Sequence, residues 1–305
     1  MKNENKIPKR TVNGILLLDK PLNLSSNTAL QIVKRLFNAK KAGHTGSLDP
    51  LATGLLPICF GEATKFSQYL LDADKTYLVK AQLGIRTKTG DAEGEIISTR
   101  GVSDFNIDAI KHALNLFLGA SEQVPPMYSA LKFQGQPLYK LARQNIEVER
   151  AKRKIFISRI ELIDYKNNII EFSVDCSKGT YIRTLVDDLG EQLACGAHVI
   201  YLRRTAVGRF DSSKMSTPEE IKNLAEINLD ELDKLLLPIE EAIAHMPISI
   251  VNAEQVYALR CGQAIFLDIL ASGLVNLQTQ NGEFIGVGET VESGKIIPRR
   301  LVSYN

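Results

Sequence analysis

One acidic residue, Asp49, is a candidate for chemistry because of the loop in which it lies. The stretch 42–57 reads AGHTGSLDPLATGLLP, so glycines precede the acid and Pro50 follows it directly. Glycines let a backbone approach another surface closely, which suits a loop that faces a ligand. An Asp before Pro is also a common turn starter, so the residues alone leave a purely local role for Asp49 open.

The residue sets of metal and hydrolase sites are missing from the sequence. The four histidines are dispersed along the chain: His44, His112, His198 and His245. Zinc needs three or four ligands at defined spacing, and His44 with Asp49 would be an incomplete set. There is no G-x-S-x-G elbow, and GHTGS does not continue into the lysine and Ser/Thr of a phosphate loop. The pair Asp187-Asp188 is typical of a solvated helix face, so the lone carboxylate remains.

The composition favours a globular protein of a reducing cytoplasm. The chain has 305 residues, 44% of them hydrophobic, which is enough for one large or two ordinary domains. Its four cysteines form no C-x-x-C pair, which argues against a zinc ribbon and against a disulfide framework. The polar start and the short apolar run ILLL fit neither a signal peptide nor a membrane span. We therefore expect a cytoplasmic protein without a membrane anchor.

Any affinity for nucleic acid must come from clusters of basic residues, because the formal net charge is only +2. Such clusters recur along the chain: Lys34-Arg35, Lys40-Lys41, Arg150 with Lys152-Arg153-Lys154, Arg203-Arg204 and Arg299-Arg300. Each cluster alone is more often a solvated face. The basic residues are therefore compatible with an RNA or DNA partner but do not establish one.

Hydrophobic patterns predict an α+β body with antiparallel strands and inserted helices that could position Asp49. Strands are expected in GILLLDKP, ATGLLPICFG, KTYLVKAQLG, KIFISRIELIDY, NIIEFSVDCS and HVIYLRRTAVGRF. Helices are expected over 29–37 behind possible serine caps, over 110–118 with an end at Gly119, and over 182–189. A further helix begins after Thr217, where Glu220 completes a capping box.

Two regions differ from this body. Residues 124–152 mix prolines, tyrosines and basic residues without a sustained period, as expected of an excursion that grips a substrate. A small C-terminal domain is expected from about residue 247, with one helix in AEQVYALRCG. Its strands are joined by Asn281-Gly282, a dipeptide that favours a type I′ hairpin turn. The predicted domains are therefore 1–246 and 247–305.

Five stretches of the chain, in this order and spacing, resemble the motifs of the TruB family of pseudouridine synthases. They are DKPLNLSSN, GHTGSLDPLATGLLP, KTYLVKAQLG, SKGTYIRTLVDDLG and YLRRTAVGRF, and the similarity spans about residues 12–210. The C-terminal region is similar only in outline to the small PUA-like RNA-binding domain of that family. Asn23 stands where the family usually has glycine, and Asn also tolerates a left-handed backbone.

The resemblance implies an isomerase that converts uridine 55 in the T-loop of tRNA to pseudouridine without a cofactor or a metal. The N1 glycosidic bond breaks, the base turns, and C5 bonds to the ribose, which needs one carboxylate rather than an acid and base pair. By the family motif that carboxylate is Asp49. Whether it attacks the sugar or the base, or abstracts a sugar proton after cleavage, stays open. The expected partner is the T-arm stem-loop, bound by a monomer.

The resemblance also implies which residues hold the substrate base. An enzyme must flip the stacked base out of the T-loop at a cost of about a few kcal/mol, which stacking in a pocket offsets. Tyr77 would stack on the flipped uracil, and Tyr181 and Leu202 would lie close by. His44 would occupy the space that the base leaves in the loop.

Three further residues are expected to support the catalytic loop. Arg183, two residues beyond Tyr181, would pair with Asp49 and keep it ionised and placed. Lys20 and Pro21 of the DKP motif would hold the loop from a neighbouring strand end. Packing at that strand end is an equally good explanation for Lys20 and Pro21.

Two other classes of function fit part of the sequence. A pure RNA-binding or RNA-folding module would use the same basic clusters and C-terminal domain but would have no need of Asp49. A nucleoside hydrolase would also cleave a glycosidic bond, yet it normally needs a water-activating base or a metal, and the sequence offers no set of residues for either. Free uracil among the products would favour the hydrolase.

Overall fold

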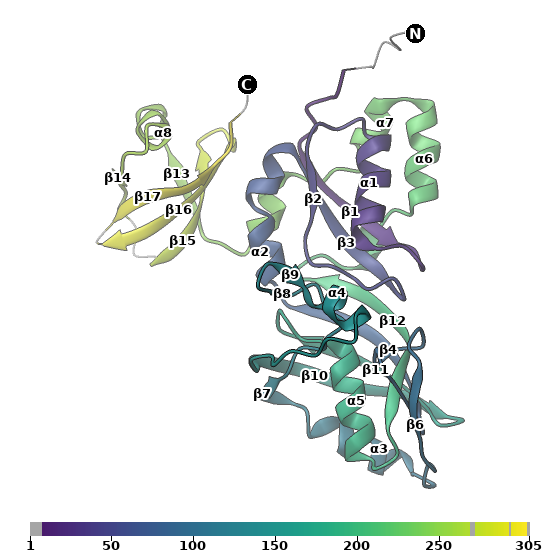
Figure 1. Ribbon diagram of the computed structural model, residues 1–305. Coiled ribbons are helices and arrows are strands. Elements are labelled where there is room, and N and C mark those ends of the chain that lie inside the picture. The colour runs from purple at the N-terminus through teal and green to yellow at the C-terminus, as the bar shows by residue number, and fades with distance from the viewer. Residues whose placement is uncertain (1–7, 269–271, 293, 304–305) are drawn as a thin grey trace.

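A long mixed sheet forms the body of the protein (Figure 1). The computed structural model describes residues 8–268, 272–292 and 294–303. The strand order is β1-β3-β12-β4-β11-β10-β7, and β2 pairs with β3 beside this path. The strands are β1 (Gly14–Lys20), β2 (Ala42–His44), β3 (Ala52–Phe60), β4 (Lys75–Leu83), β7 (Gly119–Gln123), β10 (Arg153–Lys166), β11 (Ile169–Cys176) and β12 (Ala197–Val207). Neighbouring pairs are antiparallel except β3 and β12, which are parallel.

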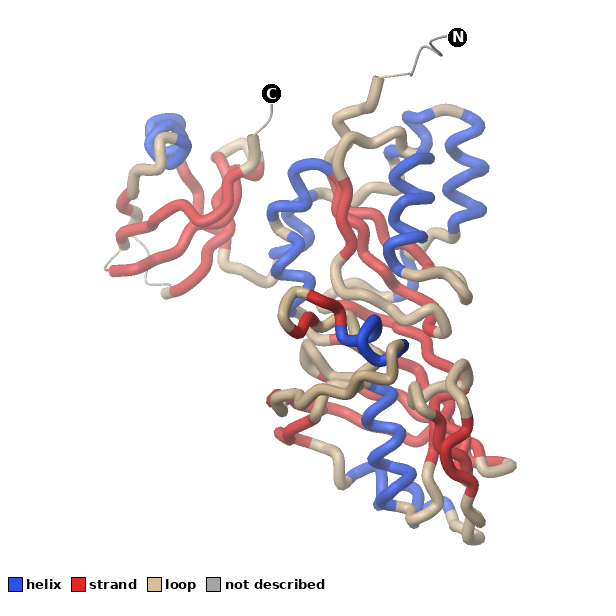
Figure 2. Tube along the Cα trace, viewed as in Figure 1, coloured by secondary structure: helices blue, strands red, loops and turns tan. Residues whose placement is uncertain are grey.

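Helices pack on this sheet at both ends of the strand order, as the blue segments of Figure 2 show. They are α1 (Ser26–Leu36), α2 (Ser67–Asp72), α3 (Ile107–Asn115), α4 (Leu138–Arg143), α5 (Ile182–Gln192), α6 (Pro218–Ile227) and α7 (Leu229–Asp233). Short 3₁₀ helices are η1 (Gly61–Lys65), η2 (Ser212–Lys214) and η3 (Ile239–Ile243). Helix α1 packs with α6 near β1, whereas α5 packs on β12 and α3 on β10. The predicted α+β class is confirmed.

Local signals in the sequence explain where these helices begin. The Ser25 hydroxyl accepts a hydrogen bond from the Thr28 N–H at 3.0 Å and caps α1. The capping box predicted at Thr217 and Glu220 is present at the start of α6. Asn23, in the turn before α1, has a φ of 64°, so the left-handed backbone expected there is confirmed.

A second, smaller sheet follows the body and lies beside it in Figure 1. Its strands are β13 (Ile248–Val251), β14 (Ile265–Phe266), β15 (Gly273–Thr279), β16 (Phe284–Glu292) and β17 (Lys295–Leu301), in the order β13-β15-β16-β17-β14, with α8 (Ala253–Arg260) packed on it. The Phe284 ring lies 5.2 Å from the Phe66 ring of the body. Lys65 Nζ donates to the Leu301 carbonyl at 3.1 Å. The two sheets therefore share apolar and polar contacts.

One predicted helix end and one predicted turn type are wrong. Helix α3 ends at Asn115 rather than near Gly119, because Phe117 and Leu118 bond back only three residues and Leu118 is exposed. The turn at Asn281-Gly282 is not type I′, since strands β15 and β16 are separated by residues 280–283. Only Gly282 has a positive φ in this loop, and its N–H bonds to the Thr279 carbonyl at 2.9 Å.

The segment 124–152 has more regular structure than its sequence indicates. It contains a small hairpin of β8 (Lys132–Phe133) and β9 (Gln136–Pro137), followed by α4. Elements this short leave no sustained period in a sequence. Within the described residues, no helix is long and apolar enough to cross a membrane.

Candidate active site

Asp49 lies in a pocket of about 400 Å³ that several distant parts of the chain build together. The lining includes Asp49, Tyr77, Tyr181, Arg183, Leu202 and Arg204, with Ser129, Ala130 and Leu131 from the segment 124–152. These residues come from the loop before β3, from β4, from the start of α5 and from β12. Five residues that the sequence singled out thus meet in one cavity.

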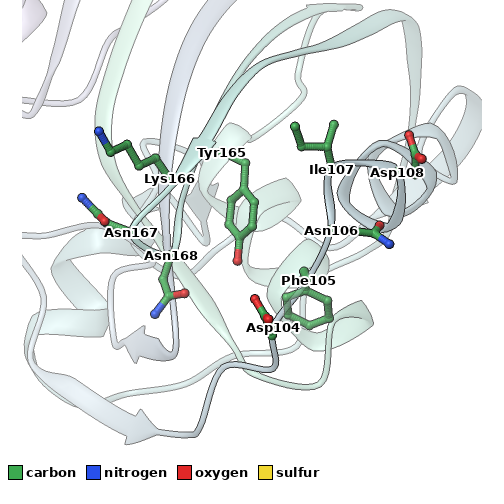
Figure 3. A pocket seen from close by; sticks show the side chains of 9 residues that line it. All are labelled: Asp104, Phe105, Asn106, Ile107, Asp108, Tyr165, Lys166, Asn167 and Asn168. Atoms are coloured by element: carbon green, nitrogen blue, oxygen red, sulfur yellow. The ribbon is translucent and has the colours of Figure 1, made fainter.

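A second hollow, shown in Figure 3, is a weaker candidate. It has a volume of about 620 Å³ and lies between the loop before α3 and the turn from β10 to β11. The Tyr165 ring stands between that turn and Phe105 in Figure 3. Its charged residues, Asp104, Asp108 and Lys166, are exposed to solvent, so their fields are screened. We therefore build the candidate site on the pocket that contains Asp49.

The backbone of the Asp49 loop is fixed by hydrogen bonds to α1 and to the turn before it. The Ser26 hydroxyl accepts from the Leu48 N–H at 2.7 Å and donates to the Leu48 carbonyl at 3.0 Å. The Asn23 N–H donates to the Pro50 carbonyl at 2.9 Å. Behind the loop, Gly54 has a φ of 98°, and a Cβ there would lie 2.3 Å from the Arg204 carbonyl oxygen. Gly54 is therefore required for the close approach of β3 to β12.

The Asp49 carboxylate does not act as an ordinary turn former. Among the described residues, no backbone N–H within the loop donates to it, whereas Arg183 Nε lies 2.9 Å from its Oδ2. Arg183 is 5% exposed at the side chain and also donates to the Thr89 carbonyl at 2.7 Å and to the Tyr128 carbonyl at 2.6 Å. These bonds hold the guanidinium in one orientation against the acid.

A second carboxylate, Asp91, lies on the other side of this guanidinium. Its Oδ2 is 3.6 Å from Arg183 Nη1, and the residue is 3% exposed. The loop that carries it joins β5 (Ile85–Thr87) to β6 (Ile96–Thr99), and Thr89 Oγ1 and the Glu93 N–H donate to Asp91 Oδ1 at 2.5 and 3.1 Å. Arg183 thus bridges two acids, of which only Asp49 lines the pocket.

The pKa of Asp49 reflects opposing influences. Although 41% of the side-chain surface faces the open pocket, the carboxyl lies deep in the fold, and this burial raises its pKa. The Arg183 guanidinium opposes the rise, and the Asp91 carboxylate adds to it. The pair with Arg183 therefore favours an ionised Asp49 in a place where burial alone would favour a neutral acid.

Two tyrosines and a leucine form apolar walls of the pocket. Tyr77 on β4 and Leu202 on β12 are buried, and burial raises the pKa of the Tyr77 hydroxyl. Tyr181 is the residue before α5, and burial raises its pKa as well. The Gln123 side chain accepts from the Tyr181 N–H at 2.8 Å and donates to the Tyr181 carbonyl at 3.1 Å. Gln123 thereby fixes the backbone that carries Tyr181.

Lys20, Pro21 and His44 lie outside the pocket lining. Lys20 Nζ donates to the carbonyls of Pro21 at 2.8 Å, Leu24 at 2.7 Å and Pro50 at 3.5 Å, which ties β1 to the catalytic loop. Burial lowers its pKa to about 8. His44 is half-buried on β2 opposite Ile58, and burial, together with the Arg204 charge, lowers its pKa.

Sequence reasoning missed Asp91, Gln123 and the role of Arg204. As a basic pair, Arg203-Arg204 predicts a solvated face, whereas Arg204 is 1% exposed and lines the pocket. The alternation of β12 could have predicted this position, because residues two apart on a strand share a face and the resemblance assigns Leu202 to the pocket. Asp91 and Gln123 carry no comparable pattern in the sequence. Within the described part of the chain, no group of three or more His, Cys, Asp or Glu residues could hold a metal ion.

Three family models match consecutive parts of the chain. TruB family pseudouridylate synthase (N terminal domain) matches residues 34–182, and tRNA pseudouridylate synthase B C-terminal domain matches residues 183–244. Pseudouridine synthase II TruB, C-terminal, matches residues 247–302. Together these matches cover most of the chain.

Individual proteins are similar over nearly the same length. The tRNA pseudouridine synthase B of Coxiella burnetii (strain Dugway 5J108-111) is 52% identical over 302 residues, which are 98% of each chain. The protein of that name from Nitrosococcus oceani is 52% identical over 303 residues, 99% of this chain and 98% of the relative. A solved structure described as a Cbf5-Nop10-Gar1 complex contains a chain with a TM-score of 0.75 and 26% identity, covering 96% of this chain and 85% of that one.

Proposed function

Because the chain belongs to the TruB family of pseudouridylate synthases, we propose that it converts uridine 55 in the T-loop of tRNA to pseudouridine, with Asp49 as its catalytic carboxylate. The chain isomerises uridine in tRNA, as its 52% identity to enzymes of that name indicates. The proposal extends this activity to one position and one acid. The observation that supports it best is the ion pair of Asp49 and Arg183 inside a pocket walled by Tyr77 and Tyr181.

The proposed mechanism uses the pocket in three steps. The target base leaves the T-loop stack and enters the pocket, where the ring of Tyr77 offers a surface for stacking. Asp49, held ionised by Arg183, acts on the sugar or the base, and the N1–C1′ bond breaks with its electron pair on the uracil. The base turns, C5 bonds to C1′, and the C5 proton is lost while N1 regains a proton. Atoms and charge balance without any further reactant.

We propose that Tyr77 works mainly through its ring. Tyr77→Ala is expected to weaken binding of a T-arm hairpin by about 1 to 3 kcal/mol, because it removes the stacking surface for the flipped base. Tyr77→Phe is expected to bind normally and to lose rate only if the hydroxyl takes part in proton transfer. Filter binding and single-turnover pseudouridine formation separate the two effects. Normal turnover and binding by Tyr77→Ala would mean that the base lies elsewhere.

Within the proposed function, residues 1–246 form the catalytic domain and 247–305 a PUA-like RNA-binding domain. The segment 124–152 is proposed to grip the RNA, since it contributes Ser129, Ala130 and Leu131 to the pocket. The small sheet is proposed to add affinity through β17, which carries Arg299 and Arg300. Arg299 pairs with Glu289, whereas Arg300 has no ion-pair partner among the described side chains.

Neutralising Arg299 and Arg300 is expected to weaken tRNA binding and to flatten its salt dependence. Point substitutions are preferable to truncation, because removing the small sheet would uncover Phe66. Each lost phosphate contact should reduce the slope of log affinity against log salt by roughly 0.7 to 0.9. Lys222→Gln on α6, which lies away from the small sheet in Figure 1, is the matched control. If the Arg299→Gln/Arg300→Gln variant keeps the wild-type affinity and salt slope, the proposal that this domain binds RNA through β17 is wrong.

We also propose that the enzyme acts as a monomer in the cytoplasm. A single chain brings Asp49, Arg183, Tyr77 and Tyr181 together in one pocket, which is consistent with activity as a monomer. Light scattering of the free enzyme and of its tRNA complex tests the stoichiometry. A dimer in both states would contradict a monomeric enzyme.

Incubation with an unmodified T-arm hairpin, followed by mapping of pseudouridine, tests the proposed function directly. Pseudouridine at the position of uridine 55 alone is the expected result. Free uracil with an abasic product would instead indicate the nucleoside hydrolase, and RNA binding without any product would indicate a pure RNA-binding module.

A further inference from the structure

Three buried cations beside the Asp49 pocket are held by backbone carbonyls rather than by carboxylates. Lys20 donates to three carbonyls, as described above, and Lys75 Nζ donates to the carbonyls of Leu70 at 3.3 Å and Leu71 at 2.6 Å, and also to that of Ala73. Arg204 donates through Nε to the Leu55 carbonyl at 2.7 Å and through Nη2 to the Gly46 carbonyl at 3.0 Å. Carbonyls orient these groups but carry no formal negative charge to pair with them.

Arg204 is the cation among these three that lies directly across the sheet from Tyr77, whereas Lys75, which also lines the pocket, lies two residues before Tyr77 on β4. Arg204 lies opposite Tyr77 in the register of β12 and β4, and such cross-strand partners share one face of a sheet. Leu202, two residues earlier on the same strand, shares that face. All three line the pocket. A uracil stacked on Tyr77 would therefore lie beside the guanidinium.

A buried guanidinium without a counter-charge is costly to the fold. Within residues 8–268, 272–292 and 294–303, no carboxylate lies within 4.0 Å of Arg204, although the residue is only 1% exposed. Its polar neighbours are the carbonyls of Leu55 and Gly46 and the hydroxyl of Tyr77, none of which carries a negative charge. Burying a charge without a paired charge normally costs several kcal/mol, about as much as a small domain's net stability allows. A buried guanidinium without a counter-charge can stabilise a negative charge that forms on a bound substrate.

The charge of Arg204 acts on groups around the pocket. It is among the causes that lower the pKa values of His44, Lys75 and Lys20, each after burial. The same charge opposes the rise that burial causes in the pKa of the Tyr77 hydroxyl, so Tyr77, Lys20, Lys75 and His44 are the titratable neighbours that feel it. Asp49 and Arg183 line the same pocket. A positive field therefore extends to the place where the base would lie.

We propose that the Arg204 guanidinium stabilises the negative charge that develops on the uracil ring as the target base reacts. The proposal rests on the proposed function. Breaking the N1–C1′ bond leaves its electron pair on N1, from which the charge spreads to O2 and O4. Addition of Asp49 to C6 of the base would instead place an enolate charge on O4. The uracil oxygens carry negative charge by either route, so the role of Arg204 does not depend on which atom Asp49 attacks.

The physical basis is electrostatic preorganisation. A fixed donor in a site of low dielectric stabilises a developing anion strongly and needs no reorganisation at the moment of reaction. The bonds to Leu55 and Gly46 hold the guanidinium fixed. They also suggest the competing explanation that Arg204 only ties β12 to the Asp49 loop through Gly46. The experiment must therefore separate charge stabilisation from positioning of the loop.

The test compares two T-arm hairpins that carry uridine or 5-fluorouridine at the target position. Fluorine withdraws electrons and stabilises the uracil anion by itself, so a reaction of 5-fluorouridine needs less help from the protein. Arg204→Met is expected to slow consumption of the target uridine in a single turnover by on the order of 10²-fold. The slowing should be several-fold smaller with 5-fluorouridine, and the Kd for either hairpin should change little.

The controls keep the inference falsifiable. Arg203→Gln, which removes the neighbouring arginine's pair with Asp19, is the matched control and should react normally with both hairpins. If Arg204→Met does not fold, Arg204→Lys is compared on the same two hairpins. Its loss of rate is expected to be smaller than that of Arg204→Met, and again larger with uridine than with 5-fluorouridine. An equal deficit on both hairpins, or a change in Kd alone, would overturn the proposal. Absence of pseudouridine from the wild-type reaction would instead contradict the proposed function.

Discussion

Replacing Asp49 by Asn is expected to lower the single-turnover rate of pseudouridine formation by roughly three or more orders of magnitude, while T-arm RNA still binds. The substitution is nearly isosteric and still favours a turn before Pro50, but it removes the attacking oxyanion. Because burial raises the pKa of Asp49, the ionised carboxylate destabilises the folded state at neutral pH, and the neutral amide lacks this cost. The variant should therefore fold.

A second turn acid provides the matched control for this result. Asp211 Oδ1 accepts from the Ser213 N–H at 2.8 Å and caps η2, which is the local role that Asp49 does not have. Asp211→Asn is expected to retain full activity. Filter binding and thermal melting of each variant show that only the chemical step differs. Substantial turnover by Asp49→Asn would contradict the proposed mechanism.

Asp49→Glu refines the same prediction. It keeps the charge but lengthens the side chain by one methylene, which displaces the carboxylate from Arg183 and from the base. A misplacement of about 1 Å can cost on the order of a hundredfold in rate. We expect the same measurement to place Asp49→Glu far below the wild type. Full activity would show that charge alone suffices, against the close placement that the 2.9 Å ion pair implies.

Much of the fold was predictable because its signals are local. Serine, threonine and proline residues at helix starts act within one turn, and the alternation in β4 follows directly from one buried face. The end of α3 and the turn at Asn281-Gly282 were predicted wrongly. In both places the position of the next strand, β7 or β16, decides the backbone, and the glycine or the Asn-Gly pair does not. Local patterns give the existence of an element more securely than its last residue.

The candidate site was predictable only where a motif identified it. Asp49, Tyr77 and Arg183 lie in distinct motifs of the resemblance, and the structure brings them into one pocket. Asp91 lies in a loop that reads as an ordinary turn, and only the tertiary fold places it 3.6 Å from Arg183. Arg204 reads as half of a basic pair, yet sheet register buries it. Which face a charged residue occupies depends on strand pairing, which the sequence of one strand does not contain.

Arg183→Lys is expected to reduce the rate by on the order of 10²-fold although it keeps the positive charge. The guanidinium contacts Asp49 through Nε, Thr89 through Nη1 and Tyr128 through Nη2 at the same time. An ammonium group is a compact charge and cannot reach all three places. Lysine is preferable to glutamine here, because loss of the charge would leave the buried Asp91 carboxylate unpaired, which typically costs about 3 to 5 kcal/mol.

The pH dependence of Arg183→Lys distinguishes an electrostatic role from simple packing. Arg183 opposes the rise that burial causes in the pKa of Asp49, so weakening this contact should raise that pKa further. Because only the ionised acid reacts, the acid limb of kcat/KM should move to higher pH, and the deficit should be largest in acid. Arg86→Lys, at the separate pair with Asp187, is the control and should leave the profile unchanged. A deficit that is uniform across pH would mean that Arg183 positions Asp49 without tuning its ionisation.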